Sequence, residues 1–125
     1  MAAVVLNGTV MRGQPAHANL DGATFVEDVR TAAAYRLYTI GDRHPAMLRD
    51  DKRGTAISAE LYEVPDEVWP GIRDTEPLRL YRGPVELEDG RMVEGMLGRE
   101  TLVDGPEAVE ITMHGGWREY LAERG

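Results

Sequence analysis

The stretch from Val4 to Gly13 constrains the fold more than any other part of the chain. Val4, Val5 and Leu6 form an apolar run that is typical of a buried strand. Asn7-Gly8 interrupts this run. A buried strand that opens into a glycine-containing loop is suited to holding a small anion, because backbone N–H groups converge there without side-chain bulk. An ordinary strand followed by a turn is the simpler interpretation of this stretch alone, and neither GxxxxGK[ST] nor GxGxxG is present.

Short strand patterns separated by turn residues fill most of the remaining sequence. The strongest turn signal is Glu88-Asp89-Gly90-Arg91, which predicts a hairpin. In the last helix, Trp117, Tyr120 and Leu121 fall on one face. In chain order we predict a short helix over 16–23, strands over 24–31, 35–40, 55–64, 78–82, 83–87, 92–97 and 107–111, a helix start at 65–69, and a terminal helix over 117–123, with a short apolar piece at 45–48.

These elements indicate an α+β fold, a small mixed β-barrel or curled mixed sheet with short flanking helices. The 125 residues suit one domain, and no linker divides them, so we expect a single domain over 1–125. A chain of this length buries roughly two-thirds of its unfolded surface, which is enough for a real core.

Composition narrows the possible functions. The net charge of −8 argues against nucleic acid as a partner, because binding to phosphates needs a basic surface. We expect no membrane partner, since no apolar run approaches membrane-spanning length. The absence of cysteine removes disulfides and thiol catalysis, and is compatible with a cytoplasmic location.

The three histidines give no metal-binding pattern. His17, His44 and His114 lack the HExxH motif or any paired spacing, so we expect them on loops or at the surface and predict no metal and no cofactor. Ser58, the only serine, lies within a predicted strand and outside any GxSxG motif, which argues against a serine nucleophile.

The carboxylates and tyrosines are the stronger candidates. Glu60 lies on a strand with apolar and aromatic neighbours, and buried carboxylates are uncommon unless they are paired or functional. Glu76 precedes a predicted strand, and one positioned carboxylate suffices for general acid–base catalysis. Tyr81 is one of several tyrosines that can line a pocket, although tyrosines in strands more often pack across the sheet.

The order of these pieces resembles the γ-glutamylcyclotransferase-like superfamily. Asn7 to Gln14 is similar to that family's Tyr-Gly-Ser/Thr-Leu loop, with Asn7 in place of the tyrosine, and Ala59-Glu60-Leu61-Tyr62-Glu63-Val64 is similar to its Gly-Glu-Leu-Tyr-Glu strand. The resemblance implies that the loop holds the substrate carboxylate and that Glu76 is the general acid and base. The implied reaction cyclises a γ-glutamyl amide to 5-oxoproline and a free amine.

A second resemblance is at least as close. Tyr35-Arg36-Leu37-Tyr38, Pro77-Leu78, Leu87-Glu88-Asp89-Gly90 and especially the segment Glu110 to Ala122, with its Gly-Gly-Trp-Arg sequence, are similar to the C-terminal domain of allophanate hydrolase. A histidine in the loop of that pattern falls at Val10 here. Since no amidase domain precedes the segment in these 125 residues, we expect a free-standing relative.

Three functions follow from the two resemblances. The first is the cyclisation of a γ-glutamyl amide, and the second is action on a small N-carboxylated urea derivative. The third is a non-catalytic binding module or accessory subunit of a separate amidase, motivated by Asn7 and Val10. The partners expected are a small carboxylate or amide substrate, and either an amidase or a second copy paired through an edge strand such as 92–97. The predicted site consists of Glu76 as the catalytic residue and Asn7, Gly8, Thr9, Val10, Met11, Glu60 and Tyr81 as substrate-binding residues.

Overall fold

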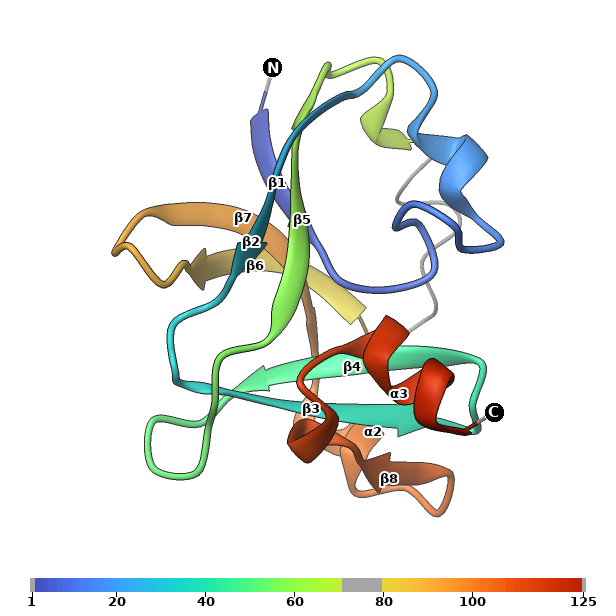
Figure 1. Cartoon of the computed structure of the whole chain (residues 1–125), viewed down its shortest axis with the longest axis vertical. Helices are drawn as coiled ribbons and strands as arrows, with labels where there is room; N and C mark the ends of the chain where they lie inside the picture. The colour runs from blue at the N-terminus through green and yellow to red at the C-terminus, as the bar shows by residue number, and fades with distance from the viewer. Residues whose placement is uncertain (1, 71–79, 125) are drawn as a thin grey trace.

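The computed structural model describes residues 2–70 and 80–124, which form two β-sheets flanked by short helices (Figure 1). The strands of the larger sheet, in spatial order, are β2 (Thr24–Arg30), β5 (Ser58–Val64), β1 (Ala2–Leu6), β7 (Met92–Gly98) and β6 (Leu80–Glu86). Those of the smaller sheet are β4 (His44–Arg49), β3 (Tyr35–Ile40) and β8 (Ala108–Glu110). The helical segments are η1 (His17–Leu20), α2 (Glu100–Val103), η2 (Thr112–His114) and α3 (Trp117–Arg124).

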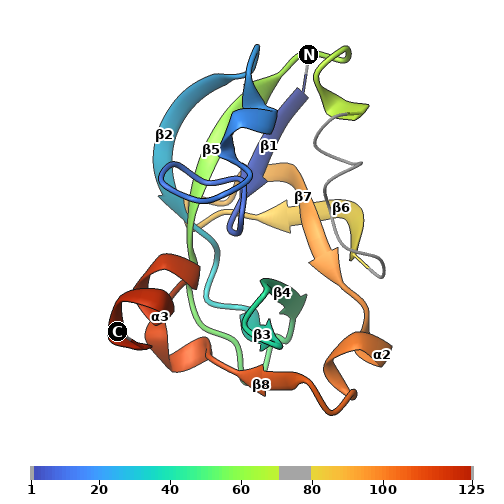
Figure 2. The ribbon, with the colours of Figure 1, turned by 90° about the vertical axis from the view of Figure 1, so that its right-hand side faces the viewer.

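Strand β1 is the centre of the larger sheet. It pairs antiparallel with β5 and parallel with β7, and β7 forms an antiparallel hairpin with β6. The smaller sheet lies below the larger one, and α3 runs beside it (Figure 2). The described strands form two sheets and no closed barrel, so of the two predicted architectures the curled mixed sheet is the one observed.

Two apolar clusters hold the sheets and the first loop together. The main cluster takes side chains from both sheets and from α3, which makes the sheets a single packed unit. The second lies between β1, β5 and the segment around η1. Because side chains alternate along a strand, β1 contributes Val5 to the first cluster and Val4 and Leu6 to the second. The residues that follow β1 are therefore packed over its second face.

The sequence predicted most of these elements. The strands at 24–31, 35–40, 55–64, 92–97 and 107–111 are confirmed, and so are the helical turn near 17–20 and the terminal helix, whose Trp117, Tyr120 and Leu121 pack on the main cluster. The hairpin turn is confirmed with Gly90 at φ +92°, a backbone conformation that suits glycine. The described parts of the segments at 78–82 and 83–87 form the single strand β6.

Three expectations about elements need correction or completion. The apolar piece at 45–48 is part of strand β4, and the short helix α2 was not predicted. Strand 92–97 is not an edge, because it lies between β1 and β6, so it is not available for pairing with a second copy. The predicted helix start at 65–69 opens with a turn in which the Val68 N–H donates to the Pro65 carbonyl at 3.0 Å.

Within the described residues, no helix has the length and apolar character needed to cross a membrane.

Candidate functional site

The loop after β1 leaves three consecutive backbone donors unused. The Met11 N–H donates to the Gly8 carbonyl at 3.1 Å and closes a tight turn. Within residues 2–70 and 80–124, the N–H groups of Gly8, Thr9 and Val10 have no acceptor. The Val10 and Met11 side chains are buried and anchor the turn in the protein. Successive N–H groups in a fixed turn form a concavity that attracts anions.

A small hollow of about 20 Å³ lies against this loop. Its wall is formed by Leu6 to Val10 on one side and by His44, Pro45 and Met47 of β4 on another, with Leu80 and Met96 completing the described part. A space of this size holds about one water-sized group. No Asp or Glu is among the described residues that line it, so nothing in this wall repels a bound anion.

His44 supplies the hollow with an ionisable side chain. It is 9% exposed and is the first residue of β4. The expectation that His44 lies on a loop or at the surface is therefore wrong. Its Nδ1 lies 3.0 Å from the Pro45 carbonyl oxygen. A carbonyl only accepts, so Nδ1 carries the proton in the neutral ring and Nε2 is the atom able to accept one.

Glu60 ties the other end of the loop to β5. Its side chain is fully buried, and Oε1 accepts the Arg12 backbone N–H at 2.9 Å and the Tyr62 hydroxyl at 3.0 Å. Oε2 accepts Arg12 Nε at 2.6 Å and Arg118 Nη1 at 3.1 Å. Burial alone would raise the pKa of the Glu60 carboxyl, but the hydrogen bonds from Arg12 and Tyr62 and the charge of Arg118 outweigh it and hold the pKa below its ordinary value.

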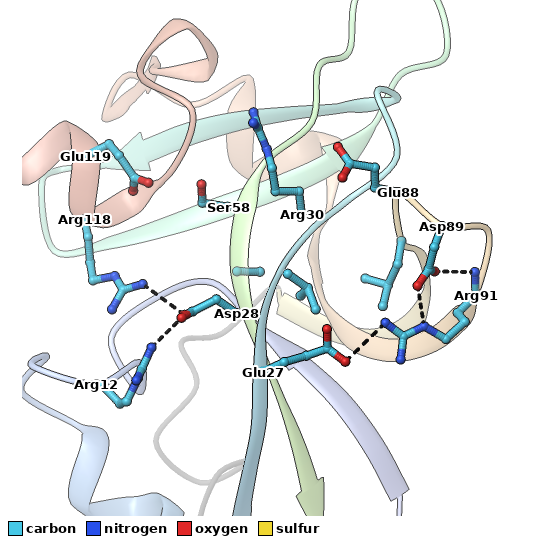
Figure 3. Close-up of a pocket in the computed structure, with 13 residues that line it drawn as sticks. Arg12, Glu27, Asp28, Arg30, Ser58, Glu88, Asp89, Arg91, Arg118 and Glu119 are labelled. Atoms are coloured by element: carbon cyan, nitrogen blue, oxygen red, sulfur yellow. Dashed lines mark hydrogen bonds and ion pairs between the residues drawn. The ribbon is translucent and has the colours of Figure 1, made fainter.

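Beyond Arg12 and Arg118 lies an open cleft of about 480 Å³ (Figure 3). It is bounded by β2, the start of β5, the β6–β7 hairpin and the first turn of α3. Both arginines and carboxylates line it, and some of them are paired: Arg12 with Asp28 at 2.6 Å, and Arg91 with Asp89 at 2.8 Å. The described residues therefore include, among several hollows, a small one on the loop and a larger charged one beside Glu60.

Comparison with known proteins assigns the family. The family model described as the allophanate hydrolase C-terminal domain matches residues 2–122. The chain belongs to this family. It is 32% identical over 121 residues to a urea amidolyase of Saccharomyces cerevisiae, a match that covers 91% of this chain and 7% of that protein. The chain thus spans only a small part of the length of the curated relatives that it matches.

Solved structures agree with the family assignment. The Escherichia coli protein c4763, described as specific to uropathogenic strains, is 37% identical with a TM-score of 0.91, and the match covers 97% of this chain and 95% of that one. Kluyveromyces lactis urea amidolyase is 28% identical with a TM-score of 0.92, covering 98% of this chain and 8% of that one. An AIG2-like protein of Mus musculus is 27% identical with a TM-score of 0.65, covering 86% and 81%. Both predicted resemblances, to the allophanate hydrolase domain and to the cyclotransferase-like fold, are confirmed.

The predicted site residues of this family member fall into separate places. Asn7, Gly8, Thr9 and Val10 line the small hollow. The Met11 side chain is buried, and Glu60 faces the arginines of the larger cleft. Tyr81 is 36% exposed, with the Arg99 guanidinium 4.7 Å from its ring centre. Glu76 lies outside the described residues.

Sequence reasoning missed His44, Arg12 and Arg118 as functional candidates. His44 was assigned to a loop because Pro45 follows it, although the turn residues Gly41 and Asp42 before an apolar run are a hairpin signal. Arg12 and Arg118 reach Glu60 from 48 and 58 residues away in sequence, a distance over which no local pattern carries information. Among the described residues, no cluster of three His, Asp or Glu side chains is arranged to hold a metal ion.

Proposed function

We propose that this domain binds a small N-carboxylated urea derivative or a related carboxylated amide, with an anionic oxygen on the loop after β1. The observation that carries the proposal is that the N–H groups of Gly8, Thr9 and Val10 have no acceptor among the described residues. The membership of the chain in the allophanate hydrolase C-terminal domain family supports the substrate class.

The size and lining of the hollow fit one anionic head group. Its volume of about 20 Å³ accepts an oxygen or a carboxylate end, while the rest of the ligand stays outside. Oriented backbone donors of this type stabilise negative charge that develops during reaction. His44 is the proton-transfer group of this proposal, because it lines the hollow and its Nδ1 bond to the Pro45 carbonyl leaves Nε2 as the nitrogen that accepts a proton. Acid–base help from a positioned histidine is worth ~10²–10⁴-fold in rate.

Calorimetry with malonate tests the binding site. Malonate is a stable dicarboxylate that mimics a small N-carboxylated compound, and we expect it to bind at millimolar concentration. The His44→Gln variant should bind it several-fold more weakly, because one polar contact is lost while the backbone donors remain. The matched control is His114→Gln, since His114 pairs with Glu123 near the C-terminus and is not among the residues that line the hollow. Absence of binding at millimolar malonate, or equal binding by the His44 variant, would contradict the proposal.

A second candidate function is the cyclisation of a γ-glutamyl amide to 5-oxoproline. The AIG2-like neighbour favours it through its likeness in fold and sequence. In this reaction Glu76 takes a proton from the α-amine, which attacks the γ-amide carbonyl, and then returns the proton to the leaving amine. The Glu76→Gln variant should keep its fold by circular dichroism and lose amine release from γ-glutamyl amides. Retention of that activity in the variant would eliminate this mechanism.

The greater length of the curated relatives suggests that this domain works together with a larger protein. The curated urea amidolyases carry the matching region within chains of which it makes up 7%. We propose that an amidase works with this domain, and the cysteine-free composition is compatible with the cytoplasm as the place where they meet. If the domain is a non-catalytic accessory subunit of that amidase, it will copurify with the amidase. The purified domain by itself will then turn over neither N-carboxylated urea derivatives nor γ-glutamyl amides.

A further inference from the structure

The larger cleft has a rigid wall built around a buried carboxylate. Glu60 is fully buried, and its Oε2 holds Arg12 and Arg118, which come from opposite ends of the chain. A guanidinium fixed in this way has lost its side-chain freedom before any ligand arrives, which lowers the entropic cost of binding. This wall is independent of the loop hollow, because none of the residues Gly8 to Val10 lines the cleft.

Hydrogen-bond donors remain unused along the cleft. Arg118 gives only Nη1 to Glu60, and its Nη2 stands 3.9 Å from Asp28, too far for a hydrogen bond. The Arg30 guanidinium and the Ser58 hydroxyl have no hydrogen-bond or ion-pair partner within the described part of the chain, although both residues line the cleft. Figure 3 shows Ser58 between Arg118 and Arg30. Two guanidinium groups and a hydroxyl that line one cleft match the needs of a carboxylate.

Two carboxylates in the same cleft are also unused. The side chains of Glu119 and Glu88 line the cleft and make no ion pair or hydrogen bond with the described residues. A Cβ placed on Gly116 would lie 2.6 Å from Glu119 Oε1 and 3.1 Å from Ser58 Cβ, so Glu119 and Ser58 lie near each other beside Gly116. On the other side, the Glu88 N–H donates to the Arg30 carbonyl at 2.9 Å, which fixes the hairpin beside the end of β2. Unpaired charges of both signs therefore share one hollow.

The balance of charge excludes a simple anion as the best ligand. Four arginines line the cleft against five carboxylates, those of Glu27, Asp28, Glu88, Asp89 and Glu119. Charges at this range act within about one Debye length, so a purely anionic ligand meets as much repulsion as attraction. A volume of about 480 Å³ is within the range of small-molecule sites. We propose that this cleft is a second ligand site, for a small zwitterion whose carboxylate binds Arg30, Arg118 and Ser58 and whose ammonium group binds Glu119 or Glu88.

NMR titration with simple probes tests this site in the intact chain. Glycine and 4-aminobutanoate carry both charges at two separations, whereas acetate and methylammonium carry one charge each. We expect at least one zwitterion to shift the amide resonances of Ser58 and Glu119, with an affinity at least tenfold higher than that of either single-charge probe. The amide resonances of Gly8 to Val10 report separately on the loop, so failure of the cleft proposal and failure of the proposed function are distinguishable.

Substitution of Arg30 gives the decisive comparison. Arg30 is exposed and its side chain has no partner among the described residues, so we expect Arg30→Gln to keep the native spectrum and to bind the zwitterion at least tenfold more weakly. Arg53→Gln, which changes an exposed arginine outside the cleft, should bind like the unmodified protein. The proposal is overturned if neither zwitterion shifts these resonances, if acetate binds as well as the zwitterion, or if Arg30→Gln leaves the affinity unchanged.

Discussion

Glu60 shows how far a single residue can be understood from sequence. Its burial follows from its place on an apolar strand, and the structure confirms that it faces inward. Its partners do not follow, because Arg12 belongs to the first loop and Arg118 to the last helix. The same limit applies to His44, whose neighbouring Pro45 suggested a loop although the pair lies in a buried strand. Local pattern predicts burial, whereas pairing depends on which distant segments the fold brings together.

Replacement of Glu60 by glutamine should destabilise the domain by about 2–3 kcal/mol, as expected for the loss of charged hydrogen bonds at a buried site. Glutamine keeps the size of the side chain but presents Arg12 and Arg118 with no negative charge. Urea denaturation of the variant measures the difference in the free energy of unfolding. Glu63→Gln, an exposed position on the same strand, is the matched control and should change stability by less than about 0.5 kcal/mol.

The pH dependence of stability provides an independent check on Glu60. Its pKa in the folded protein lies below the ordinary value of 4.5, so the ionised carboxylate stabilises the fold above that pH. The stabilisation is lost as the pH falls through the folded-state pKa. The difference in stability between the protein and Glu60→Gln should therefore be constant above pH ~5 and shrink below pH ~4. A difference that stays constant to low pH would show that Glu60 is not held ionised.

At the scale of elements, strands with alternating side chains or a clear turn signal were predictable from sequence, and β4 was not. The pattern of β3 alternates, and the Asp89-Gly90 turn fixes the β6–β7 hairpin, so both follow from local sequence. Strand β4 has its first four residues buried on both faces, so its side chains do not alternate between polar and apolar. A short continuous apolar run containing proline indicates strand and loop equally well.

Gly54 gives a sharp test of how β3 and the segment before β5 are joined. A Cβ on Gly54 would lie 2.2 Å from the backbone of Ala34 and Tyr35 and 2.5 Å from the Asp50 carbonyl oxygen. Backbone atoms cannot move aside as a flexible side chain can, so Gly54→Ala should cost about 3 kcal/mol or more. Thermal unfolding measures the loss. Gly105→Ala, whose Cβ would meet one atom at 3.3 Å, should be much milder, and equal effects at both positions would refute the packing described.

At the scale of the whole molecule, two sheets share one core, and the loop hollow and the larger cleft have different linings. The main apolar cluster joins both sheets to α3, and on this basis we propose that residues 1–125 form one domain. The fold class followed from the count and order of short elements, and the family followed from motifs spread over the chain. The location of the first loop was predictable from its glycine. The larger cleft was not, because its residues come from the first loop, β2, β5, the β6–β7 hairpin and α3.

The most direct test of the central proposal is an amide NMR titration of the isotope-labelled protein with malonate. The proposal places an anionic oxygen against the N–H groups of Gly8, Thr9 and Val10, for which the described part of the chain supplies no acceptor. Their resonances should shift downfield and saturate at millimolar malonate, together with those of the His44 ring. No change at these three amides, or changes confined to Ser58 and Glu119 in the other cleft, would contradict the assignment of the loop as the substrate site.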